Sequence, residues 1–194
     1  MLFTQSRYIK PVAIALLAAA VSACASTAQT PAKPASKAPD VALNNTDWYQ
    51  VRTQSEVYVF DDYAVFTQFV QTGKAPALKP LDKKDNFGRA LILGLKAEEQ
   101  NLPLKDIAAS RFLDVSLVPG NPFYGEIRKD GVIYVFARYG DMMDMYKSGE
   151  PTFSYTEIGG GPNGERVVYG LMKEEKKPEK QIALFHSKYP KAAQ

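Results

Sequence analysis

The stretch that decides the fold is WYQVRTQSEVYVF, residues 48–60, which returns 76 residues later as YGEIRKDGVIYVF, residues 124–136. In both stretches, β-branched and aromatic residues lie on either side of a short polar segment, which is typical of a β-hairpin. The second polar segment contains an Asp-Gly pair at positions 130–131, and both residue types accept the positive φ that a two-residue turn requires. We therefore predict one hairpin in each stretch.

The similarity extends on both sides of the two hairpins. At the same spacing of 76 residues, twelve identities fall in the 55 positions from Asn45 to Glu99, where unrelated stretches would give roughly four. We infer two copies of one unit, residues 44–118 and residues 119–194, that together form one compact domain.

Each copy has the predicted order ββαββα, because hydrophobic spacing and turn residues recur at matched positions. The predicted hairpins span 48–60, 77–96, 124–137 and 153–172, and the predicted helices span 62–72, 104–113, 140–148 and 179–189. Consecutive hairpins favour an α+β class with an antiparallel sheet and helices packed on one side.

The first 23 residues have the layout of a secretory signal peptide. Arg7 and Lys10 precede an uncharged stretch, residues 11–23. This stretch is shorter than the roughly 20 residues that a membrane-spanning helix needs. We expect it to be a cleaved signal.

The signal ends in Val21-Ser22-Ala23-Cys24, an aliphatic residue and two small ones before a cysteine, which resembles the bacterial lipobox. The resemblance implies a diacylglycerol on the Cys24 thiol, cleavage before Cys24 and acylation of the new amine. Ala25 follows, which by the same resemblance indicates a periplasm-facing outer-membrane lipoprotein. The alternative is ordinary cleavage after Ala25, which would give a soluble periplasmic or secreted protein.

The segment after the predicted signal and the net charge of the chain limit the kinds of partner that can be expected. Residues 24–43 comprise the lipidated cysteine and an Ala/Pro-rich linker without aromatic residues, which cannot form a core and indicates a disordered tether.

The whole chain has a net charge of +3. Removal of Arg7 and Lys10 leaves 22 basic against 21 acidic residues, so the mature chain is close to neutral. A nucleic-acid partner is therefore not expected.

Few residues point to catalysis or to a metal. His186 is the only histidine, and Cys24, the only cysteine, is consumed by the lipid, so we predict no metal, no cofactor and no catalytic set. Asp61 and Asp62 precede a predicted helix, where carboxylates cap free N–H groups. An envelope hydrolase would need a cleft that brings one of them close to a second titratable group. The glycine-rich segment 159–164 precedes a strand, so a turn is favoured over a phosphate-binding loop.

Two sets of residues remain as candidates for binding. Arg52 and Arg128 recur at equivalent places and could present two guanidinium groups to one anion. Alternatively, they are exposed strand residues paired with acidic neighbours. The second set is aromatic and could form a partner surface, unless helices and the other copy cover it. It consists of Trp48, Tyr58, Tyr124 and Tyr134.

These observations predict a non-enzymatic binding or scaffolding domain for another envelope component, held at the membrane through the lipid on Cys24. The alternative is a protein that binds or senses a small anionic ligand at a site between the two copies, through Arg52 and Arg128.

Overall fold

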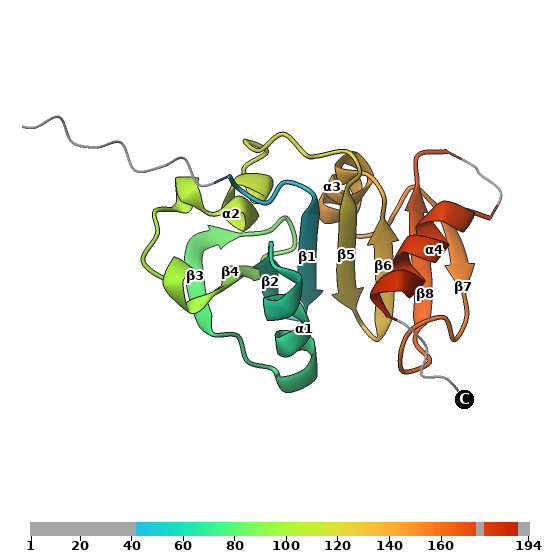
Figure 1. Ribbon diagram of the computed structural model, residues 1–194, viewed down its shortest axis with the longest axis horizontal. Coiled ribbons are helices and arrows are strands. Elements are labelled where there is room, and N and C mark those ends of the chain that lie inside the picture. The colour runs from blue at the N-terminus through green and yellow to red at the C-terminus, as the bar shows by residue number, and fades with distance from the viewer. Residues whose placement is uncertain (1–41, 174–176, 190–194) are drawn as a thin grey trace, which may run out of the picture. The chain divides into compact units, whose positions relative to one another are not determined.

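The computed structural model describes residues 42–173 and 177–189. The predicted signal peptide, Cys24 and all of the predicted linker up to residue 41 lie outside the described residues. Within the described ranges, eight strands form one sheet and four α-helices pack against it, so the fold is of the mixed α+β type (Figure 1).

The strands and helices divide evenly between the two halves of the chain. The first half, residues 44–118, contains β1 (Asp47–Arg52), β2 (Glu56–Phe60), α1 (Tyr63–Thr72), β3 (Ala77–Lys84), β4 (Ala90–Leu95) and α2 (Ala108–Leu113). The second half, residues 119–194, contains β5 (Tyr124–Lys129), β6 (Val132–Phe136), α3 (Tyr139–Ser148), β7 (Phe153–Glu157), β8 (Arg166–Leu171) and α4 (Glu179–Lys188). Two short 3₁₀ helices, η1 (Ala97–Glu99) and η2 (Leu104–Asp106), precede α2.

Local sequence signals explain where several elements begin and end. The side chain of Asp62 accepts hydrogen bonds from two backbone N–H groups in the first turn of α1, as expected of an N-cap. Gly73 and Gly149 end α1 and α3 in the left-handed region, with φ of 70° and 90°. Asp130 and Gly131 form the β5–β6 turn with φ of 53° and 73°.

The strands lie in the order β3-β4-β2-β1-β5-β6-β8-β7. The four hairpin pairs are antiparallel, whereas β2–β4, β6–β8 and the central pair β1–β5 are parallel. The prediction of an antiparallel sheet is therefore wrong, because the sheet is mixed. Tight turns determine only the pairs that they join, while the pairs across a helix or a long connection depend on tertiary packing.

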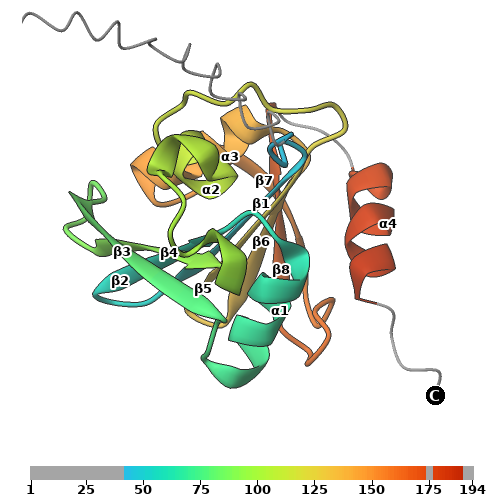
Figure 2. The same ribbon diagram turned by 60° about the vertical axis from the view of Figure 1, so that its left-hand side comes forward.

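The helices cover both faces of the sheet, which corrects the expectation that they lie on one side. The α2 and α3 helices pack on one face, called the α3 face below, and α1 and α4 pack on the other, called the α1 face (Figure 2). All five residues of β6 are buried. A strand with apolar side chains on both faces would expose one of them to water if only one layer of helices were present.

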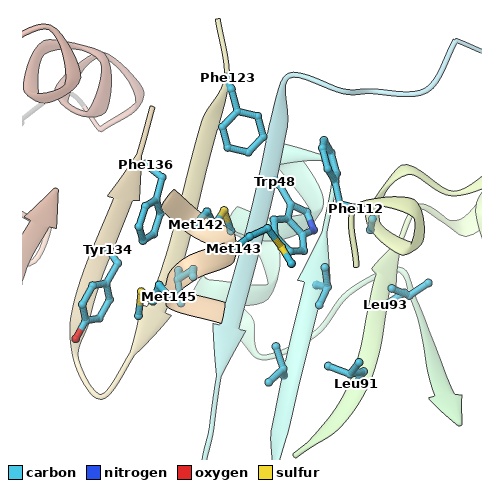
Figure 3. Close-up of a cluster of buried hydrophobic side chains, with 14 of the residues drawn as sticks. Trp48, Leu91, Leu93, Phe112, Phe123, Tyr134, Phe136, Met142, Met143 and Met145 are labelled. Atoms are coloured by element: carbon cyan, nitrogen blue, oxygen red, sulfur yellow. The ribbon is translucent and has the colours of Figure 1, made fainter. Parts of the chain in front are cut away.

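The predicted aromatic partner surface is part of the core instead. Figure 3 shows Trp48 and Tyr134 among the buried side chains of the α3 face, and their exposed fractions are 0% and 5%. The Trp48 ring lies 5.5 Å from that of Phe112 in α2. Tyr124 is buried on the α1 face, and Tyr58 is half-buried against α1. These four aromatic side chains therefore stabilise the two helix layers and do not form one exposed surface.

Candidate functional site

Arg52, the last residue of β1, carries a buried charge on the α3 face. Its side chain is only 4% exposed. Its Nε and Nη2 atoms donate to Gln50 Oε1 at 2.9 and 2.8 Å, and its guanidinium lies 5.7 Å from the centre of the Tyr146 ring. Nη1 is buried and has no hydrogen-bond partner among the described residues. The partner of Arg52 in the sheet is thus a neutral amide and not a carboxylate.

The lack of a counter-charge is the unusual feature of this residue. None of the ion pairs within the described ranges includes Arg52. Burial, and next the positive charge of Arg89, lower the pKa of Arg52 to about 10, while the negative charge of Asp85, which pairs with Arg89, opposes this shift. The side chain is therefore still charged at neutral pH. Buried charges in folded proteins are normally paired, since an unpaired one costs several kcal/mol of desolvation.

Arg52 lines a pocket of about 220 Å³ between the two halves of the chain. The pocket lies where the β1–β2 and β5–β6 turns meet the β3–β4 turn and the end of α3. From the first half, Arg52, Phe87 and Arg89 line it together with the β1–β2 turn. From the second half come Lys129, Asp130 and Gly149.

The other two cations of the pocket have counter-charges of their own. Arg89 Nη2 lies 2.6 Å from Asp85 Oδ2, and Lys129 Nζ lies 3.2 Å from Glu150 Oε1. Burial would raise the pKa of Asp85, but hydrogen bonds from the Arg89 side chain and from backbone N–H groups lower it below its ordinary value. Among the three cations, therefore, only Arg52 lacks a carboxylate within the described residues.

One wall of the pocket is apolar. The Phe87 side chain is 51% exposed, and the Arg89 guanidinium lies 5.1 Å from the centre of its ring. Gly149 faces the same ring, and a Cβ at this position would come within 3.1 Å of it. Gly149 therefore both ends α3 and leaves room for the Phe87 ring beside the pocket.

Arg128, the equivalent of Arg52 in the second half, does not reach this pocket. In the parallel β1–β5 register, Arg128 lies beside Val51, and Arg52 lies beside Lys129. Because successive side chains of a strand point to opposite faces, the two arginines lie on opposite faces of the sheet. The structure therefore does not assemble the expected joint site with two guanidinium groups.

Arg128 is paired within the protein. Its Nε lies 2.9 Å from Glu126 Oε1, and its Nη1 lies 3.7 Å from Glu165 Oε1. Glu126 is fully buried and also accepts hydrogen bonds from the hydroxyl groups of Tyr124 and Tyr189 at 2.8 and 2.9 Å. Burial raises the pKa of Glu126, although Arg128 opposes this shift. This cluster attaches α4 to the sheet, and Arg128 also lines a separate pocket of about 170 Å³ together with Thr67 and Tyr189.

The acidic candidates have structural partners. Asp61 is buried, and its Oδ2 accepts a hydrogen bond from the backbone N–H of Ala109 in α2 at 2.8 Å. Burial raises the pKa of Asp61 to about 6. Asp62 caps α1 and lies 3.3 Å from Lys96 Nζ. Each carboxylate therefore serves a helix start, and only the role of Asp62 follows from its place in the sequence.

The remaining candidates lie apart from the pocket. His186 Nε2 is 3.3 Å from Glu157 Oε2 on the α1 face. Gly159 and Gly164 adopt φ of 70° and 81° in the connection between β7 and β8, as a turn requires. Within residues 42–173 and 177–189, there is no group of three or more potential metal ligands among His, Cys, Asp and Glu.

Sequence reasoning identified Arg52 but missed Phe87 and Arg89 in the β3–β4 turn and Lys129 at the end of β5, since these segments lie far apart in the sequence. One signal was present nevertheless. At the spacing of 76 residues that aligns the two arginines, Gln50 in the first half corresponds to Glu126 in the second. A neutral residue where the other half has the counter-charge indicates that Arg52 is uncompensated.

The comparisons with known proteins add no family. No protein-family model matches the chain, and no solved structure matches it. Within the described part of the chain, the helices are all too short or too polar to cross a membrane.

Proposed function

We propose that this domain binds a small anionic ligand in the pocket between its two halves, with Arg52 as the principal charge. The observation that carries the proposal is the buried Arg52 guanidinium, which has a free Nη1 and no carboxylate partner among the described residues. An anion in the pocket would supply a counter-charge for Arg52 through a charge-assisted hydrogen bond, which is stronger than a hydrogen bond between neutral groups.

Thermal unfolding of the full mature protein in detergent tests this proposal. At constant ionic strength, replacing chloride with an anion that fits, from a panel of inorganic phosphate, acetate and larger carboxylates, is expected to raise the melting temperature by several degrees. The variant R52Q is expected to lose this shift. The variant K105Q removes one exposed positive charge elsewhere and is expected to keep it. Equal shifts in R52Q and the unchanged protein would contradict the proposal.

We also propose that the domain is anchored to the membrane as a lipoprotein through Cys24. The support is the lipobox-like Val21-Ser22-Ala23-Cys24 at the end of a signal-like segment. Three acyl chains on one residue would make release negligible, at roughly 0.8 kcal/mol per buried CH₂. Mass spectrometry of the mature protein is expected to find a triacylated N-terminal peptide that begins at Cys24. An unmodified peptide that begins at Ser26 would instead indicate a soluble periplasmic or secreted protein.

A third proposal concerns the origin of the two halves, which we infer to be copies of one duplicated unit. Its support is the twelve identities at one spacing together with the strand order, in which β3-β4-β2-β1 corresponds to β7-β8-β6-β5. Duplication also accounts for two arginines at equivalent places with different partners. In this proposal, one copy kept the carboxylate that pairs with its arginine. The other copy has a neutral residue at that position, so its arginine is available to a ligand.

A further inference from the structure

The charges around the pocket restrict the charge of a ligand. The Arg89 and Lys129 side chains are paired with Asp85 and Glu150, so their positive charges are largely offset. One buried positive charge remains, on Arg52. Asp130 also lines the pocket and is exposed, so a second negative charge on the ligand would lie near its carboxylate, while Arg89 and Lys129 already have carboxylates of their own. The arrangement therefore favours a monoanion over a dianion.

The donors of Arg52 restrict the geometry of the anionic group. A guanidinium binds carboxylate and phosphate groups alike as a fork, through two parallel N–H donors. In Arg52, Nε and Nη2 are already bonded to Gln50 Oε1. The remaining nitrogen, Nη1, is buried and has no partner among the described residues, so a group that accepts its hydrogen bond must be small, as a carboxylate is, and must displace neighbouring atoms to reach it.

The size and walls of the pocket restrict the rest of the ligand. A volume of about 220 Å³ is several times the ~30 Å³ that one water molecule occupies in the liquid, so a bare carboxylate would leave most of it unfilled. The half-exposed Phe87 ring offers an apolar contact, and aromatic pairs contribute beyond simple burial.

We propose that the ligand is a monocarboxylate with an aromatic body, whose carboxylate lies at Arg52 and whose ring contacts Phe87. This inference rests on the proposed anion-binding function and adds the chemical class of the ligand. It follows from a buried cation that is in no ion pair within the described ranges, a buried nitrogen without a hydrogen-bond partner there and one aromatic wall. Benzoate is the simplest probe of this class.

Isothermal titration of the full mature protein with benzoate, acetate, phenyl phosphate and inorganic phosphate tests the inference. Benzoate is expected to bind at least tenfold more tightly than the other three. In F87A, benzoate is expected to lose most of this advantage over acetate, since the ring contact is absent. In R52Q, benzoate affinity is expected to fall at least tenfold, and K105Q serves as the control that keeps it.

The outcomes separate this inference from the proposal on which it rests. If phenyl phosphate or inorganic phosphate binds more tightly than benzoate and the binding needs Arg52, the carboxylate class is wrong and anion binding stands. If F87A binds benzoate as well as the unchanged protein, the aromatic contact is wrong. If none of the four anions binds in a way that depends on Arg52, both the inference and the proposed function fail.

Discussion

The two halves of this protein have an arginine at equivalent positions of equivalent strands, but only one of the two arginines is in an ion pair within the described ranges. Arg128 in β5 is paired with the fully buried Glu126, which two tyrosine hydroxyl groups also contact. Arg52 in β1 has the neutral Gln50 at the corresponding position and keeps a buried nitrogen without a partner among the described residues. The difference between the two environments is therefore one carboxylate in the second half where the first half has an amide, and the proposed ligand site rests on this difference.

The comparison also shows why stability and binding are separated between the halves. A buried ion pair is costly to break from one side, because the remaining charge stays buried without its partner. An unpaired buried charge is costly, and in the proposed function a bound anion would offset that cost. The second half holds the buried ion pair of the α1 face, and the proposal assigns binding to the first half.

Substituting each arginine in turn is the strongest test of the difference between the two halves. R128M leaves Glu126 buried without its cation, and we expect it to lower the free energy of unfolding by about 3 kcal/mol or more. R52M removes a buried charge that is in no ion pair within the described ranges, which would stabilise the fold, but it also leaves the buried Gln50 Oε1 without its two donors. We expect these opposing effects largely to cancel and the change to stay below about 1 kcal/mol. Urea denaturation of both variants measures the difference. Equal losses would show that the two arginines are not electrostatically distinct.

The substitution Q50E copies the counter-charge of the second half into the first. The introduced carboxylate would pair with Arg52 as Glu126 pairs with Arg128, so it would compete with any anionic ligand. We expect benzoate affinity to fall at least tenfold, or about 1.4 kcal/mol, while circular dichroism shows an unchanged fold. Unchanged affinity in Q50E would contradict the proposal that the ligand supplies the negative charge that pairs with Arg52.

Asp61 provides a pH-dependent difference between the halves, because the residue 76 positions later is Ala137. Burial raises the pKa of Asp61 to about 6 from 3.8, so the native state binds the proton more tightly than the unfolded chain. Its contribution to stability therefore grows as the pH falls through 6 and shrinks as the pH rises. Between pH 7 and 5 we expect a gain of about 1 kcal/mol from this group.

The variant D61N isolates this contribution, since it keeps an oxygen for the Ala109 N–H and cannot ionise. Urea denaturation at pH 7 and pH 5 is expected to show a smaller gain for D61N than for the unchanged protein. An identical gain in the two proteins would assign the pH dependence to other groups, such as Glu126, whose pKa burial also raises.

The helix caps give the smallest expected difference. Asp62 caps α1 with two side-chain hydrogen bonds, whereas Arg138 at the start of α3 makes no such bond to the backbone. We expect D62A to lower the melting temperature more than R138A, by the equivalent of about 0.5 kcal/mol. Thermal unfolding followed by circular dichroism checks this. A larger loss in R138A would show that its ion pair with Asp141 matters more than the cap.

Several of these features follow from the amino-acid sequence. The hairpins around Asp130 and Gly131, the cap at Asp62 and the helix ends at Gly73 and Gly149 depend on neighbours within a few residues, so local patterns predicted them. Arg52 and Arg128 emerged as candidates because they align at one spacing. The Gln50 to Glu126 exchange was visible at the same spacing, but its meaning depends on burial, which a strand pattern alone does not determine.

Other features depended on contacts between distant segments. Local hairpin signals could not reveal that β1 and β5 pair in parallel, and this pairing places Arg52 and Arg128 on opposite faces. Nor could they place Phe87, Arg89 and Lys129 around one pocket, because these residues meet only when three turns come together. The burial of Trp48 and Tyr134 likewise required the helices that cover the α3 face.

The sequence by itself determined the local elements, their order and the pair of arginines, because turn chemistry, capping and hydrophobic spacing act between near neighbours. Only the tertiary structure decided which strands are parallel, which faces the helices cover and which arginine lacks a partner among the described residues. These depend on burying apolar surface on both sides of one sheet, and on which charges that burial leaves close to one another.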